Sequence, residues 1–156
     1  MKLSVGSPAP LFTLADQAGA QHSLAKYRGQ WVFLYFYPKD DSPGCTIEAC
    51  SVRDRYDEFK KHKVAVFGIS FDSVKSHADF VKKFELPFPL LSDSDKKVIQ
   101  AYDCWGEKEY MGREYMGTLR TSFLIDPKGN IAKIYETVRP KDHVQNVLAK
   151  ILECTS

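Results

Sequence analysis

Residues 31–50 read WVFLYFYPKDDSPGCTIEAC, and their character changes in the middle. The first part, 31–38, is continuous, apolar and aromatic up to its final proline, which is typical of a strand buried on both faces. Helical spacing of apolar residues begins at Cys45. Before it, Ser42 suits a helix N-cap, and Pro43 suits the first helical position, where a missing N–H costs nothing. The stretch therefore predicts a buried strand, a loop and a helix.

The rest of the chain alternates strands and helices around this segment. Further strands are predicted at 64–70, near 89–92, and in a late hairpin whose strands, 118–126 and 131–138, flank the turn Pro127-Lys128-Gly129-Asn130. Helices are predicted at 45–61, 73–84, 95–102 and 141–153. A small N-terminal hairpin is expected from 11–14 and 22–24, and a loop from 106–118.

This order of elements predicts the fold class. Strands that alternate with helices imply right-handed parallel crossovers, and the late hairpin adds antiparallel strands to the same sheet. A central mixed β-sheet flanked by helices, with a cysteine at a strand–helix junction, is the thioredoxin-like α/β layout. Because 156 residues carry no repeat and no linker, one domain over 1–156 is expected.

Composition and charge exclude several classes of protein. The net charge of +2 arises from 22 basic and 20 acidic residues, so nucleic acid is not an expected partner. The densest basic cluster, Lys60, Lys61 and Lys63, is interpreted as a solvated helix end. No apolar run has the length of a signal peptide or a membrane span, so a cytoplasmic protein without membrane contact is predicted.

Cys45 is the strongest candidate for a reactive group. It lies in the first helical turn, among free backbone N–H groups and at the positive end of the helix dipole. These features favour the thiolate, which is the nucleophilic form. The junction also follows the carboxyl end of a central strand, where open α/β sheets bind their ligands. The alternative is a buried cysteine that merely begins a helix.

Cys50, five residues further on, poses a geometric problem. In a regular helix its Cα would lie about 8.7 Å from that of Cys45, whereas a disulfide needs about 4.4–6.8 Å. Either the two never bond, or the first turns of the helix unwind during the reaction. Cys50 is otherwise an inward-facing core residue.

The spacing Pro38-x3-Ser42-x2-Cys45 resembles the peroxiredoxin signature. The longer string FYPKDDSPGCTIEAC is similar to the PrxQ branch, also called bacterioferritin comigratory protein. The resemblance extends to VGSPAPLFTL at the start, WGEKEYMGREYMG at 105–117 and LRTSFLID at 119–126. It implies an antioxidant thiol peroxidase that reduces hydrogen peroxide and organic hydroperoxides. It further implies thioredoxin or a similar dithiol as the reductant, and a monomer.

The same resemblance assigns roles around the reactive thiol. Cys45 would attack the terminal peroxide oxygen and become a sulfenic acid, while Cys50 would resolve it as an intramolecular disulfide. Pro38 would shield the sulfenate from water. Ser42, which replaces the commoner threonine, would offer a hydroxyl to the thiolate and the peroxide. Because the helix at 73–84 has no cysteine, Cys50 is the only resolver that matches a family position.

Two further residues complete the implied site. Arg120 would hold a guanidinium near Cys45, and its permanent charge and several donors suit a thiolate and a developing oxyanion. Glu48, one helical turn after Cys45, could position Arg120. The alternatives are a surface ion pair for Arg120 and a solvated carboxylate for Glu48.

The cysteines also allow three alternative hypotheses: a metal site, a thioredoxin-type oxidoreductase and a redox sensor. A metal site lacks paired zinc spacing, because His62, His77, Cys104 and His143 are scattered. A thioredoxin-type oxidoreductase would use Cys-x-x-Cys, which the chain lacks. A redox sensor would consume about one equivalent of peroxide, whereas an enzyme turns over. Cys104 is predicted to pack in the core and Cys154 to lie near a mobile end. No cofactor motif is present, so no cofactor is expected.

Overall fold

The computed structural model describes residues 3–136 and 139–155. The strands are β1 Thr13–Ala15, β2 Gln21–Ser23, β3 Trp31–Phe36, β4 Val64–Ser70, β5 Leu90–Ser92, β6 Trp105–Tyr110, β7 Arg113–Thr118, β8 Thr121–Ile125 and β9 Ile131–Tyr135. The helices are α1 Pro43–Asp54, α2 Tyr56–Lys61, α3 Val74–Phe84, α4 Lys97–Ala101 and α5 His143–Thr155, with a short 3-10 helix at Leu24–Tyr27. Residues 137 and 138, at the end of the predicted strand 131–138, lie outside the described residues.

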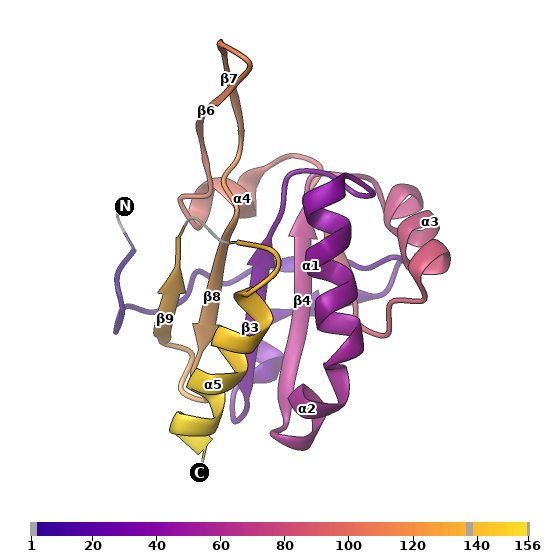
Figure 1. Cartoon of the computed structure of the whole chain (residues 1–156). Helices are drawn as coiled ribbons and strands as arrows, with labels where there is room; N and C mark the ends of the chain where they lie inside the picture. The colour runs from indigo at the N-terminus through magenta and orange to yellow at the C-terminus, as the bar shows by residue number, and fades with distance from the viewer. Residues whose placement is uncertain (1–2, 137–138, 156) are drawn as a thin grey trace.

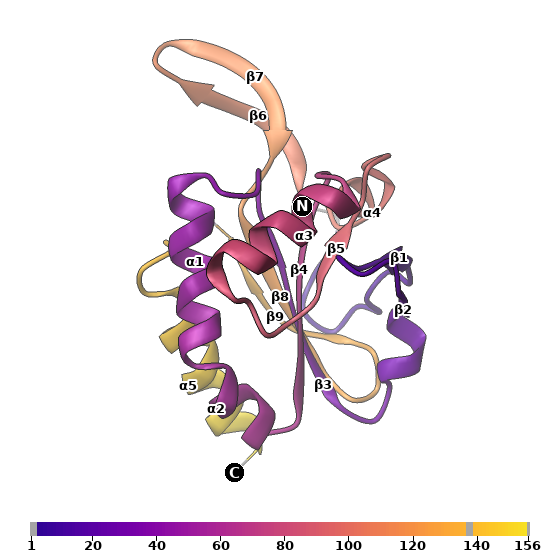
Figure 2. The same ribbon diagram turned by 90° about the vertical axis from the view of Figure 1, so that its right-hand side faces the viewer.

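A mixed seven-stranded sheet forms the centre of the molecule (Figure 1), in the order β2-β1-β5-β4-β3-β8-β9. Strand β3 pairs in parallel with β4 and antiparallel with β8, while β1 and β2 form the predicted N-terminal hairpin. Figure 2 shows α1, α2 and α5 on one side of this sheet and the β1–β2 hairpin toward the other. The thioredoxin-like α/β prediction is confirmed.

Strand β3 separates two hydrophobic cores. Phe33, Tyr35 and Tyr37 point to the core under α1, α2, α3 and α5. Val32, Leu34 and Phe36 point to the core under α4 and the N-terminal segment. All six side chains are buried, which explains why this stretch lacks polar alternation.

The expected loop at 106–118 is wrong, because β6 and β7 pair there as a separate two-stranded sheet. The hairpin turns at Met111 and Gly112, whose φ angles of 51° and 79° suit a two-residue turn of the hairpin type. It projects beyond the end of the sheet at which α1 begins (Figure 1). Tyr110, Met111, Tyr115 and Met116 are exposed on it. The sequence shows no apolar alternation here because the hairpin has little core to cover.

The helix predicted at 45–61 is divided. Helix α1 ends at Asp54 and α2 begins at Tyr56, with Arg55 at φ −116° and ψ 16° between them. The ring of Phe59 in α2 then stacks on Phe33 of β3, with ring centroids 5.6 Å apart. This contact fixes the chain after α1 to the sheet.

Candidate active site

Cys45 lies in the first turn of α1 and is 1% exposed. Ser42 is the N-cap residue and Pro43 opens the helix, as the sequence predicted. The presence of glycine at position 44 is explained by limited space, because a Cβ there would lie 3.0 Å from Nη2 of Arg120. Glycine therefore lets the guanidinium approach the start of the helix.

Arg120 joins two side chains of α1. Its Nη2 donates to Sγ of Cys45 at 3.2 Å, and its Nη1 donates to Oε1 of Glu48 at 2.9 Å. The arginine comes just before β8 rather than within it, and its side chain is 18% exposed. It is therefore not a surface pair. The guanidinium therefore lies within hydrogen-bond distance of both the sulfur of Cys45 and the carboxyl group of Glu48.

Glu48 is fully buried, so the solvated alternative is wrong. Burial raises its pKa from the ordinary 4.5 to about 7, against the opposing effect of Arg120. Its second oxygen, Oε2, is buried and has no hydrogen-bond partner among the described residues. Oε2 lies 4.0 Å from Nε2 of His143.

His143 was not predicted as a site residue, because the sequence suggested it only as a metal-ligand candidate without paired zinc spacing. It opens α5 and is 4% exposed, and its Nε2 lies 2.7 Å from Oγ of Ser122 in β8. Burial, and then the charge of Arg120, lower its pKa from 6.5 to about 4. Its spacing from Val147 and Ile151, four and eight residues on, was the available signal, because it places His143 on the buried face of the helix.

The shifted pKa values of Glu48 and His143 predict opposing effects of pH on the free energy of unfolding. Between pH 4.5 and 7 the native state keeps a proton on Glu48 that the unfolded chain loses, so stability falls as pH rises. Between pH 4 and 6.5 the unfolded chain holds a proton that native His143 lacks, so stability rises. His143→Gln should remove only the rise in stability between pH 4 and 6.5, and should leave the fall caused by Glu48. Relative to wild type, its free energy of unfolding should fall by up to about 3 kcal/mol from pH 4.5 to 6.5.

Urea denaturation across this pH range measures the effect, and Glu48→Gln is the opposite control. Its free energy of unfolding should rise with pH relative to wild type. Parallel pH profiles for the wild type and both variants would show that neither group is shifted.

Ser42 and Pro38 flank the loop that leads to Cys45. The hydroxyl of Ser42 donates to the carbonyl oxygen of Lys39 at 2.8 Å, so in this state it is directed into the loop. Pro38 is half-buried and directly follows Tyr37, the residue after β3 that still packs in the core.

The four cysteines are all free thiols, and their environments differ. Cys50 is half-buried on the same helix as Cys45. Cys104 is fully buried and donates to the carbonyl oxygen of Tyr102, and burial raises its pKa to about 12. Such a thiol is unreactive and packs as predicted. Cys154 is exposed near the end of α5.

A buried polar cluster, which we call the Asp40 network, holds the loop before Cys45. Asp40 accepts from the hydroxyls of Tyr37 and Ser76 at 2.6 and 2.7 Å, and lies 2.7 Å from Nδ1 of His77. Its backbone N–H donates to Asp72 at 2.9 Å. Asp40, Asp72 and His77 are close enough to share a metal ion, but their atoms are occupied by these hydrogen bonds. The network ties the loop to α3 and to the end of β4.

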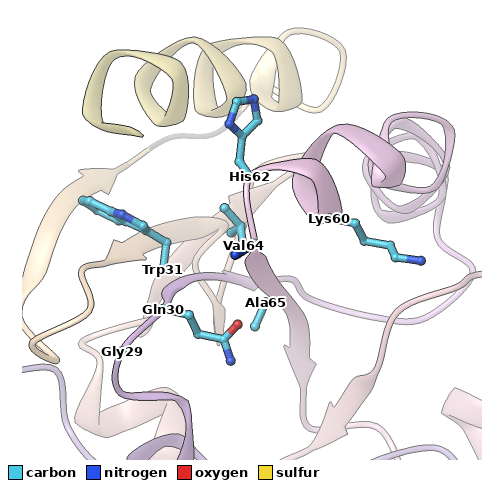
Figure 3. Close-up of a pocket in the computed structure, with 8 residues that line it drawn as sticks. Gly29, Gln30, Trp31, Lys60, His62, Val64 and Ala65 are labelled. Atoms are coloured by element: carbon cyan, nitrogen blue, oxygen red, sulfur yellow. The ribbon is translucent and has the colours of Figure 1, made fainter. Parts of the chain in front are cut away.

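A hollow of about 520 Å³ lies where β3 and β4 begin, and Figure 3 shows the side chains that line it. Trp31 and Val64, the first residues of β3 and β4, line it together with Lys60 and His62. Cys45 follows the carboxyl end of β3, so this hollow is separate from the reactive thiol.

The fold and the thiol–guanidinium pair define a class: thioredoxin-like proteins with a cysteine at the start of a helix. Residues 5–134 match the AhpC/TSA family, and the chain belongs to it, within the Bcp/PrxQ peroxiredoxins. It is 46% identical over 151 residues to the putative peroxiredoxin bcp of Coxiella burnetii, covering 97% of this chain and 100% of that protein. It is 42% identical over 148 residues to the peroxiredoxin Bcp of Bacillus subtilis, covering 95% and 94%.

Solved structures agree with this membership. The bacterioferritin comigratory protein of Xanthomonas campestris superposes with a TM-score of 0.90 at 34% identity, covering 99% of both chains. The PrxQ of Xylella fastidiosa gives 0.94 at 32% identity, covering 100% of this chain and 99% of that one. The predicted family and enzyme class are confirmed: the chain is a thiol peroxidase of the Bcp/PrxQ peroxiredoxins. None of the described helices could cross a membrane.

Proposed function

We propose that Cys45 is the peroxidatic cysteine of this peroxidase. The observation that supports it is the 3.2 Å hydrogen bond from Arg120 to Sγ. The thiolate attacks the terminal oxygen of a hydroperoxide, the O–O bond breaks, and water or an alcohol leaves. Arg120 stabilises the charge on the leaving oxygen, and Glu48 orients the guanidinium. Ser42 offers its hydroxyl once the peroxide draws it from Lys39, and Pro38 shields the sulfenate.

Cys50 is the proposed resolving cysteine. Its sulfur attacks the sulfenic acid of Cys45, forms the disulfide and releases water. Cys50 shares α1 with Cys45, whereas Cys104 is held as an unreactive buried thiol. Because a regular helix keeps the pair too far apart, α1 unwinds locally. Each backbone hydrogen bond lost costs about 1 kcal/mol, a modest barrier for a short segment.

The substrate and the reductant follow from the same assignment. The Xanthomonas relative is described by its alkyl peroxide reduction activity, and we extend organic hydroperoxides to this chain alongside hydrogen peroxide. A dithiol protein such as thioredoxin reduces the Cys45–Cys50 disulfide. Residues 1–156 act as one domain, as a monomer, in the reducing cytoplasm.

Cys50→Ser tests the resolving step. The sulfenic acid should persist after one equivalent of peroxide and become sulfinic acid with excess, because the proposed resolving thiol of Cys50 is absent. Mass spectrometry with disulfide mapping records both products. In wild type, hydrogen exchange should show lost protection of the amides at 45–50 after oxidation.

Cys154→Ser serves as the control and should form the Cys45–Cys50 disulfide normally. A disulfide from Cys45 to Cys104 or Cys154, or normal recycling of Cys50→Ser by a dithiol protein, contradicts the assignment. The enzyme would then be a one-cysteine peroxidase.

A further inference from the structure

One buried oxygen beneath the reactive thiol has no role in the reaction described so far. Oε2 of Glu48 makes no hydrogen bond within the described part of the chain, although Oε1 accepts from Arg120. A buried carboxylate oxygen without a donor is costly. A carboxyl group that carries its proton on Oε2 removes most of this cost, because the charge is gone.

The groups facing Glu48 support a neutral carboxyl in the reduced protein. Arg120 is positive and bonds both Glu48 and Cys45. His143 stands 4.0 Å behind Oε2 and is uncharged near neutral pH, because burial lowers its pKa to about 4. On β3, the hydroxyl of Tyr35 is also buried and has no partner within the described part of the chain. Burial, followed by the charge of Glu48, raises its pKa. Arg120 is therefore the one permanent positive charge facing Glu48 among these groups.

Cys45 and Glu48 compete for the single positive charge of Arg120. A thiolate at Cys45 and a carboxylate at Glu48 would place two negative charges on one guanidinium in a water-poor site. Two such groups do not both ionise readily. The buried Oε2 of Glu48, which has no hydrogen-bond partner among the described residues, favours the carboxyl group as the one that keeps a proton in the reduced state.

We propose that Glu48 stores the proton that the leaving group of the peroxide takes up. The thiolate of Cys45 attacks the terminal oxygen, giving the sulfenic acid and an alkoxide or hydroxide. Arg120 stabilises that oxygen by hydrogen bonding and keeps its own protons. Glu48 loses its proton as the negative charge on Cys45 disappears, and exchange with solvent passes a proton to the leaving oxygen. In sum, a thiolate, a hydroperoxide and a carboxylic acid become a sulfenic acid, an alcohol or water, and a carboxylate. Charge and atoms balance, and no outside acid is needed.

The oxidised state completes the cycle. Once Cys45 is a neutral sulfenic acid, Arg120 has no competing anion, and the ionised Glu48 forms a full ion pair with it. Reduction of the disulfide later restores the thiolate, and Glu48 takes a proton back. Glu48 does not touch the peroxide, so it acts as a positioning residue that also holds a proton. This proposal rests on the assignment of Cys45 as the peroxidatic cysteine.

Infrared difference spectroscopy on Cys50→Ser tests it, because that variant stops at the sulfenic acid with α1 folded. At pH 6 the reduced protein should show the band of a protonated carboxyl, and one equivalent of peroxide should abolish it. Adding Glu48→Gln should remove the band from the reduced spectrum. Glu58→Gln, which changes an exposed carboxylate paired with Arg55, should leave it in place.

Peroxide kinetics add a second readout. The wild-type rate constant for the reaction with peroxide should fall above about pH 7, where Glu48 loses its proton. Glu48→Gln should lack this fall and react roughly tenfold or more slowly at pH 6.

Three results would contradict either the assignment of Cys45 or the role of Glu48, and they distinguish between the two. Mass spectra without an added oxygen on Cys45 would overturn the assignment of Cys45 itself. An oxidised Cys45 with an unchanged carboxyl band would overturn the proton store, since the peroxide's own proton would then suffice. A reduced protein without the Glu48 band would also overturn it, because the shared proton would lie on Cys45.

Discussion

Cys45→Ser is expected to abolish peroxide reduction. A hydroxyl at this position is neither ionised nor comparably nucleophilic, although Arg120 would still lie beside it. The remaining cysteines cannot substitute, because Cys104 is buried with a raised pKa and Cys50 lacks the Arg120 hydrogen bond. Peroxide consumption with a dithiol reductant in excess measures the loss.

Cys154→Ser is the matched control for this variant, since its thiol is exposed and lies on α5. It should retain wild-type turnover. Near-wild-type peroxidase activity in Cys45→Ser would show that another thiol is the nucleophile.

The second large effect is expected at Arg120. Lysine keeps one positive charge but loses the planar fork that bonds Cys45 and Glu48 together. Removing a comparable transition-state donor costs about 100-fold to 1,000-fold. Arg120→Lys should therefore slow the reaction of Cys45 with peroxide by about 100-fold, as measured by stopped-flow fluorescence or competition kinetics.

Arg113→Lys controls for the loss of an arginine at the same end of the molecule, because Arg113 is exposed on the β6–β7 hairpin. Its rate constant should match that of the wild type. If Arg120→Lys also reacts at the wild-type rate, the guanidinium has only a structural role.

The sequence predicted the elements that pack against the sheet better than those that do not. Strands β3 and β4 were found because their side chains are buried on both faces and leave continuous apolar runs. The β6–β7 hairpin was missed because its exposed tyrosines and methionines follow no buried face. The break at Arg55 was missed because Phe59 keeps helical spacing across it.

Within the site, local signals and tertiary contacts contributed differently. Ser42, Pro43 and Cys45 are neighbours in the chain, so the start of the helix could be predicted. The burial of Glu48 could not, since it depends on α5 and on Arg120, which are distant in sequence. His143 entered the site for the same reason.

The two attachments that flank α1 decide where an unwound segment can go. The Asp40 network holds the chain before the helix, and the stack of Phe59 on Phe33 holds it after Arg55. A residue that leaves a helix lengthens the chain from about 1.5 Å to about 3.3 Å. With both attachments kept, the additional length of the proposed unwound segment would bend outward into solvent. The proposed Cys45–Cys50 disulfide would then lie on an exposed segment that a dithiol reductant can reach.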